Sequence, residues 1–275
     1  MFPVTRRNFI RRVAAVGAGL MVVKLGSSLM SGMRGREWDL LLKPGSALAA
    51  TSAGSPTPKY AYVVDVGTCI GCRKCVGACK EENGTPEGIF WMDLLYPSDA
   101  DYKYLPRPCM HCDNPPCTKV CPVNARYKRP EGFVLTDFKR CIGCRYCQVA
   151  CPYGVNYFNW KNPRSSQAPS SSSSSLAEYR DNDGRLTAGG GHYTGVIEKC
   201  TWCIHRIEKG KPVPACVEIC PVKALHFGDL NDPNSEVSQI ISKNKYFRLL
   251  EELGTEPRVF YTGGYPPKLN RKTEK

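Results

Sequence analysis

The stretch CIGCRKCVGACK (residues 69–80) places four cysteines within twelve residues, at the spacing C-x2-C-x2-C-x3-C. Three cysteines at i, i+3 and i+6 can wrap a tight loop around one corner of a polynuclear group. The glycine in Ile70-Gly71-Cys72 lets backbone N–H groups approach the sulfur atoms and stabilise negative charge there. The stretch therefore predicts a metal-binding loop.

The same motif returns later in the chain. CIGCRYC begins at Cys141 and is nearly identical to the first core, and two variants begin at Cys109 (C-x2-C-x4-C-x3-C) and Cys200 (C-x2-C-x12-C-x3-C). All sixteen cysteines fall into these four groups of four. Each unit is too small to bury a core of its own, so the repeat predicts one assembly nucleated by its cofactors.

The spacing favours iron–sulfur clusters. In two-cluster ferredoxins with this motif, the fourth cysteine of one group ligates the other cluster and leads into a proline. Here Pro122, Pro152 and Pro221 follow the fourth cysteines of three groups, whereas Lys80 follows Cys79.

Two other uses of the cysteines fit less well. A zinc site needs two cysteine pairs separated by a spacer, which close a single tetrahedron. A disulfide scaffold would suit an exported protein, but it spreads its cysteines along the chain. Both remain alternatives to the cluster interpretation.

The charge of the chain does not indicate a nucleic-acid-binding protein. The net charge is +13, and residues 1–49 hold eight basic and two acidic residues, so this segment supplies six of those charges. Each thiolate-ligated [4Fe–4S] core carries about −2, which would offset the remaining basic excess. The sequence also has no basic stripe with interleaved aromatic residues.

The N-terminal segment resembles a twin-arginine export signal. Arg6 and Arg7 precede a moderately apolar stretch at 13–30, which is weak for a membrane span. We expect an export leader at 1–49 and an extracytoplasmic, periplasmic protein that its partners hold at the membrane. A basic helix without an export role and an uncleaved anchor are the alternatives. Such a route suits a protein whose thiols are sealed by clusters before it leaves the cytoplasm.

The rest of the chain predicts an α+β fold with short strands, long loops and a C-terminal helix. We expect a linker at 50–59, a cluster-binding domain at 60–265 and a basic tail at 266–275. A second module at 109–160 is inserted between the first and fourth cysteine groups, and a Ser/Gly-rich disordered loop covers 162–192. The pattern predicts strands at 60–66, 89–96, 133–138 and 258–263, and a helix from Ser235 to Leu253 that stops at Gly254.

Taken together, these strings resemble the four-cluster, ferredoxin-like iron–sulfur subunits of molybdopterin oxidoreductase complexes, such as tetrathionate, polysulfide and dimethyl sulfoxide reductases. The resemblance runs from about Tyr60 to Tyr265. It rests on CIGCRKCVGACKEENGTPEG, LPRPCMHCDNPPCTKVCPVNA, KRCIGCRYCQVACPYGV, EKCTWCIHRIEKGKPVPACVEICPVKA and FGDLNDPNSEV. The Ser-rich insert before Cys200 is longer than the connection expected in such a subunit.

The resemblance implies two bacterial-ferredoxin-like modules, each with two [4Fe–4S] clusters, and a pairing of the cysteine groups. The implied ligands are Cys69, Cys72, Cys75 and Cys220 for cluster 1; Cys79, Cys200, Cys203 and Cys216 for cluster 2; Cys109, Cys112, Cys117 and Cys151 for cluster 3; and Cys121, Cys141, Cys144 and Cys147 for cluster 4. No ligand position is missing. Trp202 lies between two ligands, replaces neither, and is expected to pack beside its cluster.

The resemblance also implies a function. The chain would relay electrons between an integral membrane quinone-linked subunit and a molybdopterin catalytic subunit on the outer face of the membrane. The electron-transfer subunit of an exported hydrogenase or formate dehydrogenase is the alternative. The sequence has no nucleophile–base arrangement, phosphate loop or open metal position, so we expect no catalysis by this chain alone. A catalytic iron–sulfur enzyme and a storage or structural protein are the remaining classes.

Several polar residues lie beside the expected ligands. His111 and His205 are interpreted as structural, because a ligand role would require a cysteine to be absent. Nearby cations either form a solvated face that offsets cluster charge or tune the clusters and bind a partner, and the sequence leaves both interpretations open. They are Arg73, Lys74, Lys139, Arg140, Arg145 and Arg206.

Overall fold

A computed structural model describes residues 57–160 and 193–267. The chain divides into two units, Met1–Gly54 and Ser55–Lys275, and every described residue belongs to the second. The expected leader at 1–49 lies outside the described residues, as do most of the linker, the Ser/Gly-rich loop and the tail. None of the helices in the described part is long and apolar enough to cross a bilayer.

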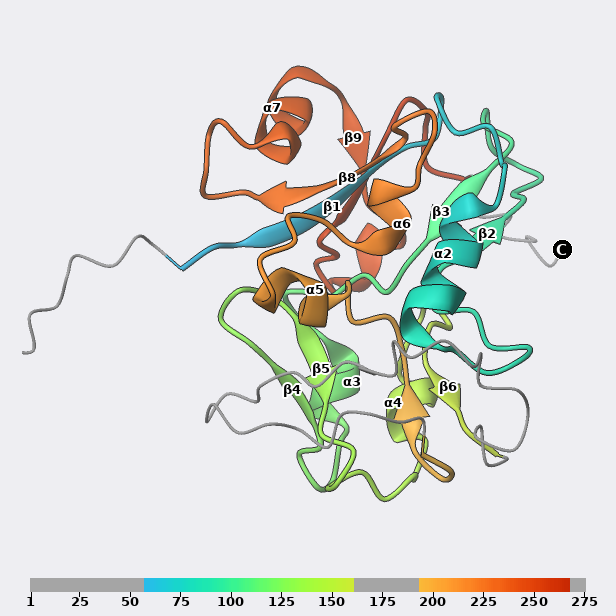
Figure 1. Cartoon of the computed structure of the whole chain (residues 1–275), viewed down its shortest axis with the longest axis vertical. Coiled ribbons are helices and arrows are strands. Elements are labelled where there is room, and N and C mark those ends of the chain that lie inside the picture. Colours follow the sequence, from blue (N-terminus) through green and yellow to red (C-terminus); the bar gives the residue numbers. More distant parts are fainter. Residues whose placement is uncertain (1–56, 161–192, 268–275) are drawn as a thin grey trace, which may run out of the picture. The chain divides into compact units, whose positions relative to one another are not determined.

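The largest sheet joins segments from the two ends of the described part of the chain (Figure 1). Its order is β8 (Leu225–Asp229), β1 (Tyr60–Asp65), β10 (Val259–Thr262) and β9 (Tyr246–Phe247). Strand β1 runs parallel to β10 and antiparallel to β8. The strands predicted at 60–66 and 258–263 are confirmed, and they are neighbours in this sheet.

Strand β1 is buried on both faces. Ala61 and Val63 contact a small cluster that includes Val237, whereas Tyr62 and Val64 belong to the main core. Alternate side chains of a strand point to opposite faces, so one apolar run serves both sides of the sheet.

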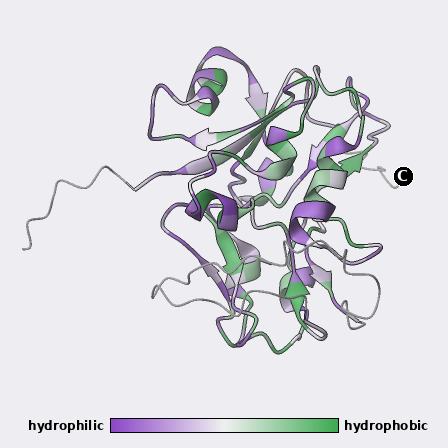
Figure 2. Cartoon of the chain, viewed as in Figure 1, coloured by the Kyte–Doolittle hydropathy of each residue, from purple (hydrophilic) through white to green (hydrophobic). Residues whose placement is uncertain are grey.

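Helix α7 (Glu236–Lys243) covers the Ala61 face of β1 and shows both hydropathy colours in Figure 2, as expected of an amphipathic surface helix. The single helix predicted over 235–253 is wrong in its extent. The chain leaves the helix after Lys243, forms β9, and then makes the short 3-10 helix η3 (Glu251–Leu253). Phe247 is buried and pairs with Tyr261 of β10, so sheet pairing replaces helix in this segment. Gly254 ends η3 at φ 62°, where the stop was predicted.

Five short helices carry or adjoin the cysteines. They are α2 (Lys74–Asn83), α3 (Pro116–Lys119), α4 (Tyr146–Val149), α5 (Ile204–Glu208) and α6 (Ala215–Glu218). Three two-stranded antiparallel sheets lie between them in the sequence: β2 (Asp93–Leu95) with β3 (Leu105–Arg107), β4 (Arg126–Lys128) with β5 (Val134–Thr136), and β6 (Tyr157–Phe158) with β7 (Ile197–Glu198). The strands predicted at 89–96 and 133–138 are present but shorter. The mixture of helices and strands is consistent with the α+β class.

Candidate metal centres

The cysteines of the first group line one cavity together with a cysteine from the fourth. Cys69, Cys72, Cys75 and Cys220 surround a space of about 330 Å³, part of which is open to solvent. Cys75 lies in α2, and Cys220 follows α6. We call these four residues quartet 1.

The remaining cysteines of the first and fourth groups also meet. The pKa of Cys79 is raised well above its ordinary value, first by burial and then by the adjacent thiols of Cys200, Cys216 and Cys203. The Nδ2 atom of Asn83 lies 3.6 Å from the Cys79 sulfur and 3.8 Å from the Cys203 sulfur. Cys79, Cys200, Cys203 and Cys216 form quartet 2, and all four are buried.

The second and third groups exchange cysteines in the same way. Quartet 3 lines a space of about 330 Å³ and consists of Cys109, Cys112, Cys117 and Cys151. Quartet 4 lines a space of about 310 Å³ and consists of Cys121, Cys141, Cys144 and Cys147. The structure thus brings together the same four sets of cysteines that the resemblance implies.

Two glycines allow the repeated loops to form. Gly71 and Gly143 adopt φ angles of 70° and 68°, a conformation that side chains with a Cβ rarely adopt. A Cβ on Gly143 would lie 2.1 Å from the carbonyl oxygen of Gly195. The arginines at the starts of α2 and α4, Arg73 and Arg145, also have positive φ angles, so the two CIGCR segments share their backbone form.

The donor sets fit a polynuclear iron–sulfur group. Each quartet presents four soft sulfur ligands, and all sixteen cysteines are free thiols. Within the described ranges no three His, Cys, Asp or Glu side chains meet as a single metal ion requires. Burial raises the pKa of Cys75, Cys112 and Cys200 to about 12, so binding of a cluster must displace protons from neutral thiols.

Quartet 2 receives side-chain hydrogen bonds that sequence spacing could not reveal. The buried hydroxyl of Tyr62, in β1, lies 3.2 Å from the Cys216 sulfur and donates to it when that sulfur is a deprotonated ligand. Asn83, at the end of α2, donates toward Cys79 and Cys203. Such donors stabilise negative charge on cluster sulfurs.

Trp202 and His111 fill the junction of quartets 2 and 3. The indole N–H of Trp202 donates to the Cys109 carbonyl at 3.0 Å, and the two rings stack at 4.2 Å between centroids. The His111 Nδ1 accepts a hydrogen bond from the Val134 N–H at 2.9 Å, so its Nε2–H donates to the Cys200 carbonyl at 3.0 Å. Both nitrogens of His111 are satisfied by the backbone, which supports the structural role predicted for it.

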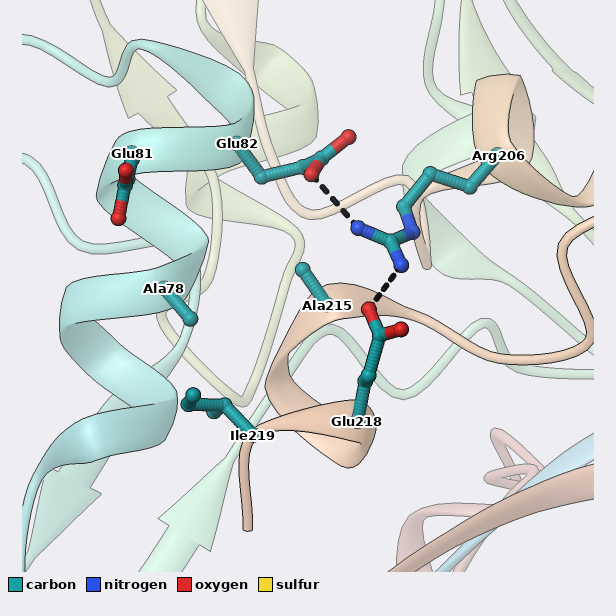
Figure 3. A pocket seen from close by; sticks show the side chains of 7 residues that line it. All are labelled: Ala78, Glu81, Glu82, Arg206, Ala215, Glu218 and Ile219. Atoms are coloured by element: carbon teal, nitrogen blue, oxygen red, sulfur yellow. Dashed lines mark hydrogen bonds and ion pairs between the residues drawn. The ribbon is translucent and has the colours of Figure 1, made fainter.

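The side chain of Arg206 joins α2, α5 and α6, the three helices around quartet 2. Figure 3 shows Glu82 and Glu218 directed at the guanidinium group of Arg206. Arg206 donates to Glu82 at 2.7 Å and also pairs with Glu218, while His205 Nε2 lies 2.8 Å from the second Glu82 oxygen. These contacts connect α2, α5 and α6, which hold or adjoin Cys79, Cys203 and Cys216. The charge of Arg206 is balanced by carboxylates, so its role here is structural.

The other cations noted beside the ligands are exposed. Arg145 lies over the rings of Phe158 and Trp160, at 5.3 and 4.7 Å from their centroids. Exposed positions favour the interpretation of a solvated face. The residues concerned are Arg73, Lys74, Lys139, Arg140 and Arg145.

The chain matches known iron–sulfur proteins. It matches two families that are both described as "4Fe-4S dicluster domain". One match covers residues 68–125, and the other covers residues 100–169 and 190–230. It is 42% identical to a Halobacterium salinarum protein named as an iron–sulfur subunit of dimethyl sulfoxide reductase, over 74% of this chain and 79% of the other. It is 33% identical to a subunit of the tetrathionate reductase of Salmonella typhimurium, over 94% and 88% of the two chains. It is 35% identical to the iron–sulfur cluster-binding subunit of a menaquinone reductase of Nitratidesulfovibrio vulgaris, over 74% and 88%.

The fold and the cysteines therefore define an iron–sulfur protein with ferredoxin-like dicluster domains. More particularly, the chain belongs to the family of iron–sulfur subunits of molybdopterin reductases, which transfer electrons and are not the catalytic subunits of their complexes. This confirms the resemblance drawn from the sequence.

Proposed function

We propose that each quartet holds one [4Fe–4S] cluster and that the chain is a four-cluster electron relay. The observation that carries this proposal is the gathering of all sixteen cysteines into four sets, three of which line a cavity of their own. When bound, such clusters supply reversible one-electron carriers. The polypeptide spaces the carriers, excludes water from them and donates hydrogen bonds to their ligands.

The electrostatic effects of the cysteines on one another and on Arg126 support a linear order. Cys75 of quartet 1 is near enough to raise the pKa of Cys216 in quartet 2. Cys109 of quartet 3 acts in the same way on Cys200 of quartet 2. Cys147 of quartet 4 and Cys117 of quartet 3 both act on the buried Arg126. The proposed order is therefore quartet 1, 2, 3, 4.

Exposure supports quartets 1 and 4 as the ends of the relay. Cys72 in quartet 1 and Cys144 in quartet 4 are exposed, whereas all of quartet 2 is buried. Electron transfer weakens steeply with distance, so a partner must approach a quartet near the surface. Electrons would enter at one of these ends and leave at the other.

The partners in this proposal are a molybdopterin-containing catalytic subunit and an integral membrane subunit that exchanges electrons with quinone. Relatives that are named as reductase subunits, one of them a menaquinone reductase, support both. Arg6 and Arg7 support export through the twin-arginine route and a site of action on the outer face of the membrane. The electron-transfer subunit of an exported hydrogenase or formate dehydrogenase is the second candidate.

Anaerobic purification of the chain with its native partners tests the proposal. We expect about sixteen iron atoms per chain, four one-electron steps in a redox titration, and a copurifying molybdenum-containing large subunit. A colourless zinc protein, or clusters that do not change oxidation state, would contradict it. A copurifying nickel-containing subunit would support the hydrogenase alternative, and a large subunit that oxidises formate would support the formate dehydrogenase.

Export is tested separately. Replacement of Arg6 and Arg7 by lysine should hold the folded, iron-loaded chain in the cytoplasm, as judged by cell fractionation. Unchanged export of this variant would remove the twin-arginine part of the proposal and leave the relay intact.

A further inference from the structure

Arg126 lies in the wall between quartets 3 and 4. It begins β4, is 3% exposed, and lines the same cavity as the four cysteines of quartet 4. Its Nη2 donates to the Asn156 Oδ1 at 2.8 Å, and Asn156 lines the cavity of quartet 3. Asn156 in turn donates from Nδ2 to the Cys147 carbonyl at 2.8 Å. One hydrogen-bonded pair therefore joins the two cavities.

The charge of Arg126 faces sulfur atoms. Its Nε and Nη1 have no oxygen or nitrogen partner within the described residues. A guanidinium group stays protonated in proteins, and after burial the groups that act most strongly on Arg126 are the thiols of Cys147, Cys117 and Cys109. The charges that act on it most strongly are thus cysteines of quartets 3 and 4, not carboxylates.

Arg129, just beyond the same strand, shows the contrast. It donates to Glu131 at 2.7 Å and to Glu208 at 2.5 Å, so two carboxylates in direct contact balance its charge. An uncompensated cation in a low-dielectric wall acts on its neighbours far more strongly than a paired one. Sequence spacing could not distinguish these two arginines, because both lie outside the cysteine motifs.

We propose that the fixed positive charge of Arg126 raises the reduction potentials of the clusters at quartets 3 and 4. Electrons in the relay therefore reside preferentially on these two clusters. The inference rests on the proposed four-cluster function. Reduction adds negative charge to a cluster, and a buried cation stabilises the reduced form relative to the oxidised form. Hydrogen bonding and net charge around a cluster are known determinants of its potential. Arg126 itself lines the cavity of quartet 4, whereas only its partner Asn156 lines that of quartet 3, so the effect should be larger at quartet 4.

The experiment is an EPR-monitored redox titration of the full-length chain, purified anaerobically with four clusters. In Arg126→Gln we expect two of the four one-electron steps to move to lower potential. The equilibrium constant for electron transfer from the clusters at quartets 1 and 2 to those at quartets 3 and 4 should fall at least tenfold. This factor corresponds to 59 mV for a one-electron step. The other two steps should not move. Arg126→Lys keeps the charge, so its reduction potentials should lie close to those of the wild-type chain.

Two further variants keep the test decisive if Arg126→Gln does not assemble. Asn156→Asp leaves Arg126 in place and puts a carboxylate at its hydrogen-bond partner, so it should lower the same two steps. Arg129→Gln removes an arginine of equal formal charge that is already paired, and it should shift none. Either a shift of all four steps or unmoved potentials in Arg126→Gln and Asn156→Asp would overturn the inference. A wild-type chain with fewer than four redox steps would overturn the proposed function instead.

Discussion

The hydroxyl of Tyr62 lies 3.2 Å from the sulfur of Cys216, and both groups are buried. Tyr62 lies in the middle of β1 and Cys216 in α6, 154 residues later. The central strand of the sheet therefore donates a hydrogen bond to a proposed cluster ligand.

Tyr62→Phe should lower the reduction potential of the cluster at quartet 2. The variant removes one hydrogen bond, worth about 1 kcal/mol, that favours the more negative state, so a shift of roughly 40 mV is expected. An EPR-monitored titration measures it. Tyr60→Phe is the matched control, because Tyr60 lies on the same strand and its ring packs on Phe227. Equal shifts in both variants would show that the hydroxyl of Tyr62 has no specific effect.

Gly143→Ala should prevent quartet 4 from holding its cluster. The new Cβ would meet the Gly195 carbonyl oxygen at 2.1 Å and would also require φ near 68°, so the loop must move. Iron content should fall by about four atoms per chain.

Gly77→Ala is the control for this variant. Gly77 lies inside α2 with nothing within 4 Å of its Cβ position, so alanine should keep all the iron and stabilise the helix by about 1 kcal/mol. Full iron content in Gly143→Ala would show that the loop tolerates a side chain.

The gathering of cysteines into quartets could be predicted because the motif is local and the resemblance supplied the pairing of the groups. That each quartet ligates a cluster stays a prediction. Tyr62, Asn156 and Arg126 could not be found in this way, since their effect comes from proximity to cysteines distant in sequence. The helix predicted over 235–253 failed for a related reason. Its apolar spacing suits a helix, but the pattern cannot show that Phe247 pairs with Tyr261 in a sheet.

Arg206→Gln should loosen quartet 2 without removing a ligand. Arg206 joins Glu82 of α2 to Glu218 of α6, and a hydrogen bond to a charged group contributes about 1.5–3 kcal/mol when it is shielded from water. Because Glu218 is partly exposed, we expect the loss of stability to lie near the lower limit of this energy range. The measurement is the rate at which a chelator removes iron, which should rise.

Lys209→Gln is the control for the Arg206 contacts, because Lys209 is an exposed cation that follows the same helix. Its iron should leave at the wild-type rate. If both variants lose iron equally fast, the effect is one of net charge and the ion pairs of Arg206 contribute nothing.

Mild oxidation of the isolated chain should remove clusters from the two ends of the relay first. Cys72 and Cys144 are exposed, whereas every cysteine of quartet 2 is buried, so an oxidant in solution reaches quartets 1 and 4 before quartet 2. Thiols freed at each stage can be alkylated and identified by peptide mass spectrometry. Cys72 and Cys144 should be labelled before Cys200. Because bound partners would cover the ends, the assembled complex should protect both cysteines. Early labelling of Cys200 would place the surface of the relay at quartet 2 and would contradict the proposed order.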